Sequence, residues 1–209
     1  MEDFKITKEF ADNLMTLKGN IRGGFFVSHF RYVKNLKGDE GVKLVEERLE
    51  RLGYPTKEKE VSNVKWYPEA LASLMILATA EVFNLTKEDV FQMGKESIKT
   101  SFIIRVLMSH FLNLEKAFKE APKYWRKNYD FGNVEIIGFG EKEKHCTISI
   151  KNFRLAKDAE KHHPWTCVYH TGYFSGIIEM LLPNKKIKIK HEKCFFSGQD
   201  EMEFKITWD

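Results

Sequence analysis

The stretch from His163 to Phe204, HPWTCVYHTGYFSGIIEMLLPNKKIKIKHEKCFFSGQDEMEF, decides the fold. Residues 164–182 have helical spacing, with a proline at the first turn and Pro183-Asn184 as the stop. Beyond that stop the period changes to the alternation of a strand. One face of the final strand is apolar, which predicts a one-sided antiparallel sheet; that face carries Met202, Phe204, Ile206 and Trp208.

Two further strands precede this stretch. Residues 134–139 alternate imperfectly, which predicts a bulge near Gly138, and residues 144–155 alternate cleanly. The short polar connection between them predicts a hairpin. In that hairpin Cys146 falls on the apolar face, so we expect it to be buried as a small apolar residue.

The first 130 residues have helical spacing throughout. Amphipathic patterns predict helices over 7–18, 38–53, 68–84 and 96–120, with a short helix after a capping box formed by Thr86 and Asp89. Pro122 is expected to close the last of these, leaving residues 123–130 as a bridge. The sequence therefore predicts an α+β fold: an antiparallel β-sheet with helices packed on it and a helical N-terminal half. We expect portions 1–130 and 131–209 to share one core.

Composition narrows the class of protein. The chain has 209 residues, 43% of them hydrophobic and 31% charged. Its net charge of +4 is spread along the sequence, which does not indicate nucleic-acid binding. No apolar run approaches the roughly 20 residues of a membrane span, and the N-terminus lacks a secretory apolar core, so a cytoplasmic location is expected. Three cysteines do not make a complete disulfide framework, and reduced thiols are expected.

Metal-ligand residues gather in the deciding stretch. Cys167 precedes His170 by one helical turn, while His191 and Cys194 come from the following strand. A helix and a strand can supply a tetrahedral zinc site, although residues three apart need a bulge to reach one ion. Buried structural thiols are the alternative that spacing alone leaves open.

The last 75 or so residues resemble the 4-vinyl reductase domain, the module of predicted hydrocarbon-binding proteins and of phenol-sensing transcription activators. The resemblance is carried by Cys167, Gly172 and Gly176, and then by His191, Cys194, Gly198 and Phe204. It implies a zinc site at Cys167, His191 and Cys194. His191 stands where that family has a glutamate, and Met202 stands where it has a final cysteine.

The N-terminal half has a fainter similarity to heme-based nitric-oxide-binding domains. It rests on Gly24-Phe25, Gly53, Tyr67-Pro68, the stretch from Leu85 to Asp89, and Gly94. The chain lacks the Y-x-S-x-R motif of those domains. Leu114 stands near the expected heme ligand, with His110 one turn away.

The family resemblance implies a pocket for a small apolar or aromatic molecule between helices and sheet. The residues expected to line it are Phe102, Val106, His110, Phe111, Trp165, Tyr169 and Tyr173. Each of these would equally serve in an ordinary core, and His110 alternatively bonds a carbonyl within it.

We therefore expect a non-enzymatic ligand-binding or sensory domain that acts through a signalling partner or as a homodimer. The alternatives are a tetrapyrrole vinyl reductase or its accessory, a heme-based gas sensor, and a subunit that holds acyl chains in an assembly. No nicotinamide or flavin fingerprint accompanies the reductase alternative.

Overall fold

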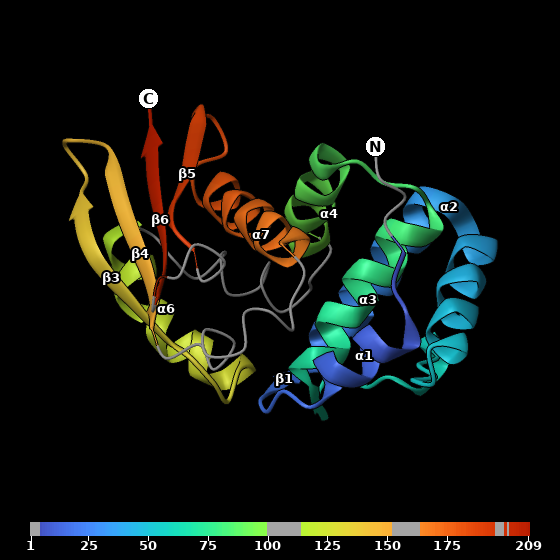
Figure 1. The fold of residues 1–209 in the computed structure, drawn as a ribbon. Helices are drawn as coiled ribbons and strands as arrows, with labels where there is room; N and C mark the ends of the chain where they lie inside the picture. Colours follow the sequence, from blue (N-terminus) through green and yellow to red (C-terminus); the bar gives the residue numbers. More distant parts are fainter. Residues whose placement is uncertain (1–4, 100–113, 152–163, 195–198, 200) are drawn as a thin grey trace.

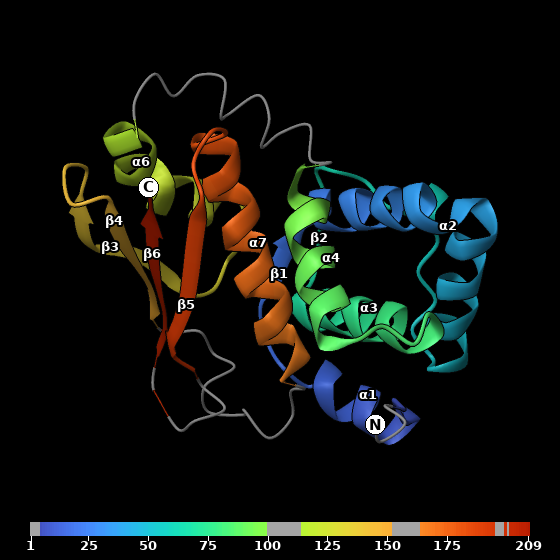
Figure 2. The same cartoon turned by 90° about the horizontal axis from the view of Figure 1, so that it is seen from above.

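A four-stranded sheet and a group of helices form successive layers on either side of one central helix. The computed structural model describes residues 5–99, 114–151, 164–194, 199 and 201–209. Helix α7 (Trp165–Leu181) lies along the sheet on one side and against α4 (Lys87–Lys99) on the other (Figure 1). The view from above shows the same order, with α1 (Lys8–Met15), α2 (Gly24–Arg51) and α3 (Glu69–Val82) beyond α4 (Figure 2).

The sheet is antiparallel, with strand order β3-β4-β6-β5. Its strands are β3 (Asn133–Gly140), β4 (His145–Lys151), β5 (Ile187–Lys193) and β6 (Glu201–Trp208). The antiparallel pairing of β3 with β4 confirms the predicted hairpin, and a register shift between Ile136 and Gly138 confirms the predicted bulge. Every second residue of β6 is buried, as the alternation predicts.

The helical half precedes the sheet in the chain. It contains α1 (Lys8–Met15), α2 (Gly24–Arg51), α3 (Glu69–Val82), α4 and α6 (Leu114–Asn128). A short 3-10 turn (Glu58–Glu60) and the small sheet of β1 (Asn20–Arg22) with β2 (Trp66–Pro68) connect them. The α+β prediction is confirmed. In the described part of the chain, no helix is long and apolar enough to cross a membrane.

Local sequence rules explain several helix ends. Thr86 and Asp89 form the predicted capping box: the backbone N–H of Asp89 donates to Thr86 Oγ1 at 3.2 Å, and the N–H of Thr86 donates to Asp89 Oδ2 at 2.8 Å. Gly38 interrupts α2 with φ of 69°, so the helix predicted over 38–53 is the second arm of a bent helix. Of the helix predicted over 96–120, residues 100–113 lie outside the described residues.

The expected stop at Pro122 is wrong. Helix α6 continues through Pro122 to Asn128, so most of the expected bridge is helical. Proline removes one backbone hydrogen bond from a helix interior. Here the burial of Phe118 and Trp125 on the same face, one full heptad apart, outweighs that loss.

The larger of two hydrophobic clusters among the described residues contains side chains from both halves. It includes Phe26 and Leu74 from α2 and α3, Phe174 from α7, and Cys146 and Phe204 from the sheet. Cys146 is fully buried, as its strand position predicts.

Candidate functional site

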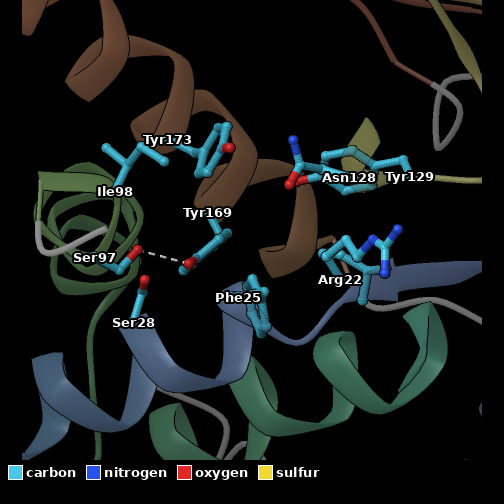
Figure 3. Close-up of a pocket in the computed structure, with 11 residues that line it drawn as sticks. Arg22, Phe25, Ser28, Ser97, Ile98, Asn128, Tyr129, Tyr169 and Tyr173 are labelled. Carbon is cyan, nitrogen blue, oxygen red and sulfur yellow. Dashed lines mark hydrogen bonds between the residues drawn. The ribbon is translucent and has the colours of Figure 1, made fainter. Parts of the chain in front are cut away.

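Two small chambers meet between the helical half and the sheet. The first, which we call the interface chamber, measures ≈ 50 Å³. It is walled by residues from β1, α2, α4, α6 and α7: Ile21, Arg22, Gly24, Phe25, Ser28, Ser97, Ile98, Asn128, Tyr129, Tyr169 and Tyr173 (Figure 3). Elements far apart in the chain therefore converge on one small space.

Hydroxyl groups line this interface chamber. The hydroxyl oxygens of Tyr169 and Ser97 are hydrogen bonded at 2.7 Å, which links α7 to α4, and Ser28 points toward the same pair from α2 (Figure 3). Burial raises the pKa of Tyr169, so its hydroxyl stays protonated. A buried hydroxyl of this kind offers a ligand both a donor and an acceptor.

The second space, the sheet chamber, lies between α6, α7 and the strands β3 and β4. It measures ≈ 100 Å³ and has a mostly apolar lining, which includes Ala121, Trp125, Ile148 and Ile177. An apolar cavity of about 150 Å³ in another protein stays dry and accepts benzene. The sheet chamber is thus of the scale that takes a compact apolar molecule.

Tyr129 and Tyr173 separate the two chambers. Both line both spaces, and their hydroxyl groups are hydrogen bonded to each other. Burial, the largest influence, raises the pKa of each. Tyr129 is held by stacking on Trp125, with ring centroids 3.9 Å apart. Together they form a polar partition between a hydroxyl-lined space and an apolar one.

Two titratable groups are buried in the helical half near the interface. His29 Nε2 is 2.9 Å from Thr79 Oγ1, and its Nδ1 has no hydrogen-bond partner among the described residues. Burial lowers the pKa of His29 to about 3, so the ring is neutral. Glu69 accepts a 2.8 Å bond from Ser73, and burial raises its pKa to about 7. Neither group lines a chamber.

The zinc prediction is wrong. Cys167 and Cys194 do meet, with sulfurs 3.4 Å apart, and β5 has the irregularity that was expected to be needed between His191 and Cys194. However, the described residues contain no group of three or more His, Cys, Asp or Glu side chains placed to hold a metal ion. The ring of His191 instead stacks on Phe204 at 4.6 Å. Two sulfurs do not complete a tetrahedral zinc site.

The predicted ligand-binding residues lie in different parts of the structure. Tyr169 and Tyr173 lie at the interface chamber, whereas Trp165 borders an open cleft of ≈ 710 Å³ at the start of α7. The remaining four, Phe102, Val106, His110 and Phe111, lie outside the described residues. Sequence reasoning missed Phe25, Ser97 and Tyr129, because no local pattern distinguishes them from core positions.

Comparison with solved structures identifies the fold. The chain is similar to an H-NOX (heme NO/oxygen binding) protein from S. oneidensis in the Fe(II)NO ligation state, with a TM-score of 0.65 and 16% identity over 90% of this chain and 99% of that one. It is also similar to an oxygen-binding H-NOX domain related to soluble guanylate cyclases, with a TM-score of 0.62 and 11% identity over 90% and 95% of the two chains. A mutant H-NOX from T. tengcongensis gives a TM-score of 0.58 at 11% identity, over 89% and 97%.

These identities establish the fold of H-NOX domains and nothing finer. The similarity to heme-based nitric-oxide-binding domains, which in sequence was the fainter of the two resemblances, therefore holds for the fold of about 90% of this chain. No protein-family model matches, so the resemblance to the 4-vinyl reductase domain has no support there. No curated protein matches either.

Proposed function

We propose that this chain is a sensory domain that binds a small ligand between its helical half and its sheet. The observation that carries the proposal is the pair of chambers meeting at Tyr129 and Tyr173. This junction involves elements of both halves, so a ligand there contacts both at once. The H-NOX fold supports the proposal, because its solved examples are named for NO and oxygen binding. The response would pass to a partner protein or a second copy of the chain.

Such a sensor can take two forms. The comparisons favour a heme-based gas sensor over direct binding of an apolar molecule, since the similar structures are named as heme proteins or in iron ligation states. This replaces zinc with heme as the cofactor to be tested.

Neither chamber, as the described residues shape it, fits a heme. Pockets for drug-sized ligands begin at roughly 300 Å³, and the chambers measure ≈ 50 and ≈ 100 Å³. Side chains of Phe25, Tyr169 and Tyr173 occupy the space between the halves. No described histidine lines either chamber, and His29 directs its Nε2 at Thr79. Direct binding of a compact ligand is the form that these dimensions support.

One titration distinguishes the two forms. Purified protein is mixed with hemin and followed by absorption, then exposed to NO after reduction. The heme-based form predicts stoichiometric binding, a band shift with NO, and loss of that shift in His110→Ala. The direct form predicts no stoichiometric hemin binding.

A second titration tests direct binding itself, with benzene as the probe and the melting temperature as the readout. We expect saturable stabilisation that Ala121→Leu abolishes by filling the sheet chamber. Lys123→Leu adds the same side chain at an exposed position of α6 and is the matched control. If neither hemin nor benzene binds the folded protein, the proposed function is wrong.

A further inference from the structure

Two cysteine sulfurs touch at the seam between α7 and the sheet. Cys167 lies near the start of α7 and Cys194 directly follows β5; their Sγ atoms are 3.4 Å apart although the residues are 27 positions apart in sequence. A disulfide bond requires about 2.0 Å, so both residues are thiols in this structure. A closing movement of little more than an ångström would join them.

The packing of α7 explains why these two residues meet. Cys167 and Phe174 are seven positions apart and so share one helix face, and Phe174 packs on Phe204 of the sheet with ring centroids 4.8 Å apart. Cys167 therefore faces the sheet. On the β5 side, the register shift between His191 and Lys193 changes the strand's path just before Cys194. Both positions are set by well-packed neighbours.

The two thiols differ in reactivity. Cys194 is partly exposed, whereas Cys167 is buried but borders the open cleft at the start of α7. The contact with Cys194, followed by burial, raises the pKa of Cys167. Cys194 is thus the thiol that an incoming disulfide reaches first, and a thiolate is the form that attacks a disulfide.

We propose that Cys167 and Cys194 are a reversible redox pair that closes to a disulfide when it meets a low-molecular-weight disulfide such as oxidised glutathione. The Cys194 thiolate attacks one glutathione sulfur, the glutathione S–S bond breaks, and one glutathione leaves as a thiolate that takes up a proton. Cys167 then loses its proton and attacks the Cys194 sulfur, releasing the second glutathione. The protein gives up two electrons and two protons, and two molecules of reduced glutathione form.

Closure would fasten α7 to the end of β5. Because α7 also carries Tyr169 and Tyr173, the bond would restrain one wall of the chambers. The inference stands on the sulfur contact and is independent of the proposed function.

The test treats the folded full-length chain with oxidised glutathione and maps its cysteines by mass spectrometry. We expect the loss of two hydrogen atoms per chain, a cross-linked peptide pair containing Cys167 and Cys194, and full reversal by dithiothreitol. Cys146 is the internal control: it is fully buried, and burial raises its pKa to about 12. It should stay unmodified.

Single variants, checked for folding by circular dichroism, test the order of attack. Cys167→Ser should stop at a stable glutathione adduct on Cys194, whereas Cys194→Ser should leave Cys167 unmodified. A stable adduct in the wild-type chain without the cross-link would overturn the proposal. So would cross-links through Cys146, or no reaction under conditions that oxidise the urea-unfolded chain.

Discussion

The contact between α4 and α7 gives the sharpest stability prediction, because their backbones touch at glycines. A Cβ atom added at Gly172 would lie 2.0 Å from the carbonyl oxygen of Phe91, and one at Gly94 would lie 2.0 Å from that of Tyr169. Real Cβ contacts are essentially never shorter than 3.0 Å, so in Gly172→Ala the new atom and the Phe91 carbonyl oxygen must separate by about 1 Å. The obstructing atoms belong to the backbone, so no side-chain rotation can move them aside.

The magnitude follows from two opposing effects. Alanine at a helix interior gains about 1 kcal/mol over glycine. Overpacking a rigid contact costs about 1–3 kcal/mol and occasionally more. Because backbone atoms stand on both sides of this contact, we expect a cost at the upper end of that range and a net loss of about 2 kcal/mol. For a chain of this size that lowers the melting temperature by roughly 4–8 °C.

Thermal and urea denaturation, both followed by circular dichroism, measure this loss. Gly176→Ala, where the new atom would meet the Lys95 carbonyl oxygen at 2.5 Å, should cost less. The matched control is Gly138→Ala on β3, whose nearest neighbour is the Thr147 hydroxyl oxygen at 3.6 Å; it should change stability by less than about 0.5 kcal/mol. The reasoning is refuted if Gly172→Ala costs no more than Gly138→Ala.

Three further predictions concern single side chains. Glu69 should make stability fall as pH rises: its pKa is raised from 4.5 to about 7, so the unfolded chain ionises it first, and about 3 kcal/mol present below pH 4.5 should be lost by pH 7. Urea denaturation across that range should show a flatter profile for Glu69→Gln, and equal slopes would contradict the assignment. Tyr169→Phe should cost about 1 kcal/mol by deleting the bond to Ser97, and a double-mutant cycle with Ser97→Ala should return a coupling of that size rather than zero. Thr86→Ala should cost about 1 kcal/mol through the lost cap of α4, whereas Lys87→Ala, exposed beside it, should be near neutral in the same melts.

Features with a short sequence period were predictable. Alternation in β4 and β6 indicated the sheet and which of its sides is buried. Those patterns report on which face of one element is buried. The continuation of α6 through Pro122 was not predictable in this way, because tertiary burial of Phe118 and Trp125 overrides a local rule.

The site was harder to predict for a different reason. Ser97 and Tyr169 are 72 positions apart and meet only because α4 packs on α7. The two sulfurs of the deciding stretch do meet, as their family-like spacing suggested. Their neighbour His191 stacks on a phenylalanine instead, and residue spacing does not determine where a ring points.

The tight α4–α7 contact also determines in which direction the chambers can grow. Ser97 and Ile98 on α4, with Tyr169 and Tyr173 on α7, form one side of the interface chamber. Since these helices already touch backbone to backbone, that side behaves as a rigid wall. A ligand larger than the chamber must therefore displace the opposite side, formed by β1, α2 and the end of α6. Binding of such a ligand would move β1, α2 and the end of α6 relative to α4 and α7, which would stay fixed.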